Sequence, residues 1–383
     1  MNEVVDDSKI FFLAEQMLEF VRAAVLDSEL NISSDATIDW DGLMDIASEH
    51  GLLAWVWDGI CKLPDNHQPN RQHRINWGLS AQEIWDNYYH KQKVLDKIVH
   101  ICSENGVRVL LLKGQSLSTL YPKPESRPSG DIDIYLFNDA IRGVELLSQG
   151  KYELSGKHYV FTIDNVMVEC HEKLIDQGTN FQKQVETYLE STLDEAILCE
   201  GGFYVLSRWS NLIHTLLHIL AHLNNPGPDP LTIRSILDYA MMLNRIVQDG
   251  LTQDYLIIVK ELRLKKASDL FVRFSEWILQ KDFSRLYSGD AENDDVEKVR
   301  QLLFRNEIRY PMFDQHSYLK QLCQRIDYYK KNRWRFSYLP SLERFRFSEE
   351  VRLQSHIFIK YIFGLPFNKP FGDSIHGLDK RHD

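Results

Sequence analysis

The sequence predicts an α+β fold in which a short segment of strands separates two helical regions. Apolar residues recur at helical spacing through the first hundred residues and again after residue 208. Between these regions, short apolar runs and alternating residues are typical of strands. The chain has 383 residues, 44% hydrophobic and 26% charged, so its composition is globular and its length is sufficient for two domains.

We expect residues 1–103 to form a helical N-terminal region. The apolar spacing predicts a first helix over 11–26 and a second over 40–57, with Asp39 as the capping residue of the second. A long third helix is predicted over 75–103. This part of the chain therefore contributes no strand to the predicted sheet.

Residues 104–207 are expected to form a core with a small sheet. A strongly apolar run bounded by glycines predicts a buried strand over 107–112. Polar and apolar residues alternate over 131–136, and an Asp-Asn turn predicts a hairpin over 159–171. A helix is expected over 138–149, so strands and helices share this segment.

The C-terminal region, residues 208–371, is predicted to be helical again. The expected helices cover 211–224, 231–249, 254–263, 267–280 and a further run that ends near Phe363. Residues 372–383 have the character of a mobile tail.

Composition excludes several classes of protein. No apolar run approaches the roughly 18 to 20 residues that a membrane helix needs, and the acidic first residues do not resemble a secretory signal. Five scattered cysteines suggest neither a disulfide framework nor a thiol zinc site. We therefore expect a soluble, cytoplasmic protein with no membrane partner.

The net charge of −11 argues against general binding to nucleic acid, but the charge is unevenly placed. Residues 1–50 hold twelve Asp or Glu against two Lys or Arg, whereas 320–352 hold nine Lys or Arg against four Asp or Glu, with aromatic residues between them. Such a basic, aromatic segment can bind RNA through charge and stacking. Solvated helix faces, or pairing with the acidic N-terminal segment, explain it as well.

Two carboxylates, Asp131 and Asp133, stand out in the core. At positions i and i+2 of a strand, their side chains project from one face about 6 to 7 Å apart, close enough to share divalent cations. We expect them at the exposed edge of this strand, because burying both without a cation would be costly. The pair is a candidate Mg²⁺ site.

Glu169 is the candidate third acid, since phosphoryl transfer with two metals needs more ligands than two side chains provide. In the segment 166–171 the apolar residues alternate with Met167, Glu169 and His171, which places Glu169 on a face that can meet the Asp pair. It could also act as a base toward an acceptor hydroxyl.

Four residues before the Asp pair suit the phosphates of a nucleotide. Gly114 allows a close approach of the backbone, and Ser116 offers a hydroxyl near exposed amides if a helix begins there. Lys113 and Arg127 supply positive charge. Together with the Asp-x-Asp pair, these residues favour a nucleotide-binding function.

This order of motifs, Gly-x-Ser, then Asp-x-Asp on a strand, then one acid on a later strand, resembles the nucleotidyltransferase superfamily with the DNA polymerase beta-like fold. More narrowly, Leu112-Lys113-Gly114, Arg127, Gly130-Asp131-Ile132-Asp133 and Glu169-Cys170-His171 look like a bacterial group of uncharacterised nucleotidyltransferases. The likeness covers most of residues 10–280.

The resemblance implies a small mixed sheet that carries the three acids and two Mg²⁺ ions, with Mn²⁺ as the alternative. The implied reaction transfers a nucleoside monophosphate from a nucleoside triphosphate, ATP among the donors, and releases pyrophosphate. Asp131 and Asp133 would bind both metals, Glu169 would hold the catalytic metal, and Gly114 and Ser116 would touch the triphosphate.

Three histidines, His214, His218 and His222, recur every four residues and lie on one helix face. A zinc site there would need a further ligand that the sequence does not indicate. The resemblance suggests instead that His218 and His222, with Arg234 and Asp238 one helix later, form a polar seam beside the active-site cleft, where His171 would also line the substrate.

Two alternatives to an active enzyme with an unidentified hydroxyl acceptor stay open. One is a catalytically inactive nucleotide-binding or partner-binding regulatory module of the same fold. The other is an RNA-directed nucleotidyltransferase that uses the segment 320–352. The sequence does not indicate the base of the donor, the oligomeric state, or whether the acceptor is a small molecule, a protein or RNA.

Overall fold

The computed structural model combines a seven-stranded mixed sheet with helices before, within and after it, which confirms the α+β class. It describes residues 7–30, 37–155, 158–175, 179–224, 230–287, 289, 293–304 and 318–338. Of the predicted features, the tail at 372–383 and the helical run beyond residue 338 lie outside these residues.

The strands of the sheet lie in the order β3-β4-β5-β2-β1-β7-β6. Their bounds are Leu110–Leu111 (β1), Ile132–Tyr135 (β2), Glu153–Ser155 (β3), His158–Ile163 (β4), Val166–His171 (β5), Ile197–Leu198 (β6) and Tyr204–Val205 (β7). At the centre, β2 runs antiparallel to β1 and parallel to β5. The predicted hairpin is the pair β4 and β5, whereas β3 was not predicted and β1 is shorter than the buried apolar run around it.

Most of the predicted helices are present. Their bounds are Asp7–Val25 (α1), Trp40–Glu49 (α2), Leu53–Ile60 (α3), Arg71–Glu104 (α4), Lys113–Ser118 (α5), Ala140–Ser148 (α6), Asn180–Ser191 (α7), Arg208–Asn224 (α8), Ile233–Gln248 (α9), Thr252–Glu261 (α10), Lys265–Leu279 (α11), Asn293–Phe304 (α12) and Tyr318–Phe336 (α14). Among the described residues, no helix combines the length and apolar character that crossing a bilayer requires.

The prediction of a single helix over 40–57 is wrong, because the structure has two helices there, α2 and α3. Asp39 caps α2 as expected, by accepting a hydrogen bond from the Gly42 amide. Gly51 then adopts a φ of +67°, in the left-handed region that glycine enters without strain, and the Leu52 amide bonds back to the Ala47 carbonyl. This glycine cap ends α2 and lets α3 leave in a new direction.

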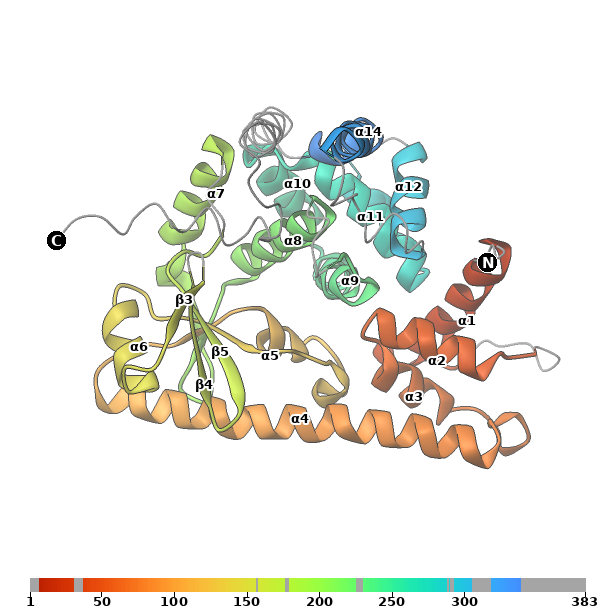
Figure 1. The fold of residues 1–383 in the computed structure, drawn as a ribbon, viewed down its shortest axis with the longest axis horizontal. Helices are drawn as coiled ribbons and strands as arrows, with labels where there is room; N and C mark the ends of the chain where they lie inside the picture. The colour runs from red at the N-terminus through yellow and green to blue at the C-terminus, as the bar shows by residue number, and fades with distance from the viewer. Residues whose placement is uncertain are drawn as a thin grey trace.

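The long helix α4 runs beneath both the sheet and the N-terminal helices (Figure 1), over about 50 Å. Near its start, Trp77 is buried in a hydrophobic cluster shared by α1, α3 and the helices α8 to α12. Near its end, Val94, Leu95 and Ile98 are buried in a second cluster with α6 and one face of the sheet. One helix therefore belongs to both hydrophobic cores.

The two clusters lie on opposite faces of the central strands. In β2, Ile132 and Ile134 belong to the cluster shared with α4 and α6, whereas Tyr135 belongs to the cluster of the C-terminal helices. In the neighbouring β5, Val168 pairs with Ile132 and Cys170 pairs with Ile134, and both belong to the same cluster as their partners. The remaining alternate positions of both strands face the helices α8 and α9, and this is where the predicted acids lie.

Candidate active site

Strands β2 and β5 bring the predicted acids together across a parallel pairing. The register places Asp133 directly beside Glu169 and Tyr135 beside His171, and Asp131 precedes β2 by one residue. Because side chains on a strand alternate between faces, all five residues belong to the face that is turned toward α8 and α9.

Three of these side chains form a candidate metal centre. One ligand atom from each of Asp133, Glu169 and His171 lies within 4.8 Å of the others, and no second group of this kind occurs among the described residues. Asp131 is not a member of this group, whereas His171, predicted only to line the substrate, is. The signal for His171 was present in the sequence, because it follows Glu169 by two residues on the same strand face.

The expectation that both acids lie at an exposed edge is wrong for Asp133, which is only 5% exposed. Its Oδ1 atom lies 2.9 Å from Lys113 Nζ and 2.7 Å from His171 Nε2. Burial alone would raise the pKa of Asp133, but the Lys113 ammonium and the hydrogen bond to His171 outweigh burial and hold the pKa well below its usual range. Asp133 is therefore a buried carboxylate that forms an ion pair with Lys113.

Asp131 has a different environment. Burial raises the pKa of its carboxyl, and the nearby charge of Asp133 raises the pKa further. Lys91, on α4, donates to the Ser129 hydroxyl at 3.2 Å and to the Ser129 carbonyl, and its positive charge acts to lower the pKa of Asp131. Lys91 is not among the predicted site residues, because its position on a long helix gives no local sign of the contact.

The backbone at the start of α5 is unusual. Lys113 has a φ of +40°, which is uncommon for a residue with a side chain and is often found at functional sites. Gly114 follows with φ of +31° and ψ of −112° inside the helix. The Leu112 amide, just before them, bonds to the carbonyl of Asp133 at 2.9 Å. This bond ties the Lys-Gly turn to the strand that carries the acids.

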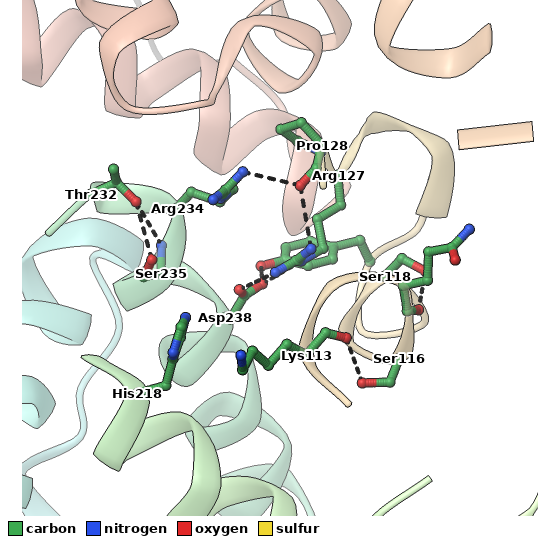
Figure 2. A network of polar contacts seen from close by, with 12 residues as sticks. Lys113, Ser116, Ser118, Arg127, Pro128, His218, Thr232, Arg234, Ser235 and Asp238 are labelled. Carbon is green, nitrogen blue, oxygen red and sulfur yellow. Dashed lines mark hydrogen bonds and ion pairs between the residues drawn. The ribbon is translucent and has the colours of Figure 1, made fainter. Parts of the chain in front are cut away.

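The two other residues predicted to contact phosphate are engaged inside the protein (Figure 2). The Ser116 hydroxyl donates to the Lys113 carbonyl at 2.6 Å. Arg127 forms a buried bidentate pair with Asp238, with Nε to Oδ1 at 2.9 Å and Nη2 to Oδ2 at 2.7 Å. The Tyr121 hydroxyl also donates to Asp238 Oδ1, at 2.6 Å. This network fixes α9 against the loop before β2.

A cleft of about 490 Å³ lies between the acids and the helices α8 and α9. One wall holds Asp131, Asp133 and Glu169. The other predicted residues that line it are Lys113, Gly114, Arg127, His218, His222, Arg234 and Asp238. Ser116 is not part of its lining, and His171 lines a smaller pocket of about 110 Å³ that Lys113 also lines.

Two of the three histidines on α8, His214 and His218, are neutral at physiological pH. His214 donates to the Leu174 carbonyl at 3.0 Å, and burial, followed by the charge of Lys113, lowers its pKa to about 3. Burial and the same charge lower the pKa of His218 well below its usual value. His218 Nε2 lies 3.2 Å from His222 Nε2. None of the three belongs to a metal-binding group within the described residues.

The site thus combines an Asp-x-Asp pair and a third acid on neighbouring strands of a mixed sheet with a cleft and a Lys-Gly turn. A family model described as uncharacterised nucleotidyltransferase matches residues 36–280, and the chain belongs to this family. The fold is accordingly a nucleotidyltransferase core flanked by helices. Comparison with the curated proteins and with the solved structures finds no match.

Proposed function

We propose that the protein transfers a nucleoside monophosphate from a nucleoside triphosphate to a hydroxyl acceptor, with release of pyrophosphate, in a reaction that depends on divalent metal ions. The observation that carries the proposal is the carboxylate face of β2 and β5. There Asp131, Asp133 and Glu169 line one wall of a cleft large enough for a substrate.

The residues present fit divalent cations. Asp133 already accepts a cation, the Lys113 ammonium, and the raised pKa of Asp131 indicates that burial and the charge of Asp133 disfavour its ionised form. Carboxylate oxygens are the ligands that Mg²⁺ prefers, and the imidazole of His171 adds a nitrogen that Mn²⁺ accepts more readily. We propose that these acids hold two ions, with His171 as an additional ligand. Bound ions would neutralise charge on the phosphates and orient them.

The remaining residues have roles that follow from their positions. Lys113 and Gly114 line the cleft beside the acids, which suits contact with phosphate oxygens. Glu169 is proposed to accept the proton of the acceptor hydroxyl. The contacts of Arg127 with Asp238 and of Ser116 with Lys113 support positioning roles for these two residues in place of direct contact with the nucleotide.

The acceptor is proposed to be a small molecule or a protein side chain. The described part of the basic segment, residues 320–338, supports a structural role for that segment. Arg335, Phe336 and Tyr338 are buried, and the Tyr338 hydroxyl donates to Asp295 on α12. The buried rings of Phe336 and Tyr338 are therefore not available for stacking with bases.

The proposal is tested by thermal melting of the wild type and of the double variant Asp131→Asn, Asp133→Asn with ATP, CTP, GTP and UTP, each with and without Mg²⁺. A bound ligand raises the melting temperature without a known acceptor. We expect a Mg²⁺-dependent rise with at least one nucleotide that is absent from the double variant. Asp96→Asn, an exposed acid on α4, is the control and should respond as the wild type does.

A second assay measures the release of pyrophosphate from the stabilising nucleotide, with pooled metabolites as acceptors. It distinguishes an active enzyme from an inactive regulatory module. Loss of a metal ligand is expected to lower the rate by at least about a hundredfold. A Mg²⁺-dependent melting shift without any pyrophosphate release would favour the inactive module. Full activity in the double variant would contradict the proposed reaction.

A further inference from the structure

Arg234 differs from every other cation of the cleft. Lys113 is paired with Asp133, and Arg127 is paired with Asp238. Arg234 makes one hydrogen bond, from Nη1 to the Pro128 carbonyl at 3.2 Å, and has no carboxylate partner within the described residues. Because a guanidinium has five N–H donors and a permanent charge, most of its binding capacity is unused.

A second guanidinium increases the electrostatic cost of this arrangement. Arg127 Nη1 donates to the same Pro128 carbonyl, at 3.3 Å, so two positive side chains meet at one oxygen (Figure 2). Burial, and then the charge of Arg127, lowers the pKa of Arg234. Asp238 neutralises only Arg127 through direct contact. On this wall of the cleft, the positive charge of Arg234 is therefore not paired with a carboxylate among the described residues.

The position of Arg234 is fixed by its surroundings. It lies in the first turn of the 16-residue helix α9, which Thr232 caps by accepting from the Ser235 amide. His50 Nδ1 accepts from the Ile233 amide at 3.3 Å. A methyl group built on Gly51 would lie 3.4 Å from Arg234 Cδ, so the junction of α2 and α3 packs against the side chain. Such support preorganises a binding site.

The helical wall of the cleft also holds a buried polar group without a partner in the part of the chain that the structure describes. Thr215, on α8, lines the cleft and is only 4% exposed, and its hydroxyl has no hydrogen-bond partner within the described residues. A buried hydroxyl without a partner lowers stability, and a bound polar ligand would recover this loss.

We propose that Arg234, with the first turn of α9, binds a phosphate group in the cleft opposite the carboxylates. A forked guanidinium and the positive end of a helix both favour a phosphate, and Thr232 and Ser235 of the same turn also line the cleft. The inference deepens the proposed function, since the phosphate belongs either to the triphosphate of the donor or to a phosphorylated acceptor.

The test measures binding without divalent metal, in excess EDTA, by calorimetry. The probes are inorganic tripolyphosphate, glucose 6-phosphate as a phosphomonoester, and adenosine as an uncharged control. The variants are Arg234→Gln, Arg234→Lys, and Arg245→Gln as the matched control. Arg245 lies on the same helix, is exposed and bonds only the Thr119 carbonyl among the described residues.

We expect Arg234→Gln to weaken phosphate binding about tenfold or more. Arg234→Lys should retain part of the affinity, because it keeps the charge but not the fork. Arg245→Gln should bind as the wild type does. Arg234-dependent binding of tripolyphosphate alone identifies the donor phosphates, and Arg234-dependent binding of the phosphomonoester identifies a phosphorylated acceptor.

Equal affinities in the wild type and in Arg234→Gln would overturn the proposal, as would an absence of binding of both phosphates to the wild type. Melting curves of each variant show whether it is folded. If Arg234→Gln does not fold, the comparison is made between the wild type and Arg234→Lys. The measurement is independent of catalysis. Metal-free phosphate binding that persists in Asp133→Asn would uphold the phosphate site even if no nucleotidyl transfer is found.

Discussion

Lys113 Nζ lies 2.9 Å from Asp133 Oδ1, so a side-chain ammonium neutralises the most buried acid of the candidate metal centre. The contact joins residues 20 positions apart through the Lys-Gly turn at the start of α5. It gives Asp133 a counter-charge that does not depend on a bound ion. A divalent ion and Lys113 would therefore compete for the same carboxylate.

We predict that Lys113→Met destabilises the metal-free protein at pH 7 by roughly 3 kcal/mol, the lower end for a broken buried pair, because Lys113 is partly exposed. Excess Mn²⁺ should stabilise this variant more than the wild type. Urea unfolding with and without the metal measures both effects. Lys97→Met removes an exposed pair with Asp164 and should change stability by less than about 1 kcal/mol. Equal stability of Lys113→Met and the wild type would contradict the prediction.

His171 is predicted to set the preference among metals. Its imidazole is the nitrogen donor beside Asp133 and Glu169, and nitrogen favours Mn²⁺ over Mg²⁺. We expect His171→Gln to weaken Mn²⁺ binding about tenfold while changing Mg²⁺ binding less. Electron paramagnetic resonance of bound Mn²⁺ and competition by Mg²⁺ give the two affinities. His158→Gln alters the ring that packs on His171 and should preserve the preference. A parallel loss of both metals in His171→Gln would exclude this role.

The buried His214 should make the protein sensitive to acid. Its pKa is lowered to about 3 in the folded state, whereas an unfolded histidine titrates near 6.5. The unfolded chain binds more protons between these values, so this contribution to stability is complete above about pH 6.5 and falls as the pH drops toward 3. The slope is at most about 1.4 kcal/mol per pH unit for one histidine.

We expect His214→Asn to reduce the pH slope of the unfolding free energy between pH 6.5 and 4.5. His100→Asn, which changes an exposed histidine at the end of α4, is the control and should leave the slope unchanged. Urea unfolding across this range measures the slope. An unchanged slope in the His214 variant would show that this histidine does not govern the acid response.

The ion pair of Arg127 with Asp238 is predicted to hold the helical wall of the cleft. Both side chains are buried, so Arg127→Met should lower the free energy of unfolding by about 3 to 5 kcal/mol. Combining it with Asp238→Leu should recover part of the loss, because no unpaired charge then stays buried. Chemical denaturation of the two single variants and the double variant gives the coupling. Arg127→Met with wild-type stability would refute the positioning role.

Local patterns predicted the acids and their strands well. Alternation placed Asp133 and Glu169 on one face, and the register of β2 and β5 confirms that placement. The helix boundary at Gly51 was predictable in principle, because a glycine after a polar residue is a common helix end. Helix α7 was missed despite a capping box formed by Thr179 and Gln182, a signal that the sequence does contain.

Contacts between distant segments could not be predicted in the same way. Arg127 and Asp238 are 111 residues apart, and no local pattern indicates that they pair. The burial of Asp133 depends on Lys113 and on the packing of α8 above the sheet, which alternation along one strand cannot reveal. The division of the chain at residues 103 and 207 stays a prediction, since the helices before and after the sheet share one hydrophobic cluster.

The sharing of helix α4 between the two hydrophobic cores has a consequence for cooperativity. Trp77 anchors the start of the helix in one core, and Ile98 anchors its end in the other. Neither core can melt without exposing part of a helix on which the other depends, so partial unfolding is suppressed. Amide protons at the two buried ends of α4, around Trp77 and around Ile98, should then show similar protection from exchange, which couples the integrity of the sheet to that of the helices across the cleft.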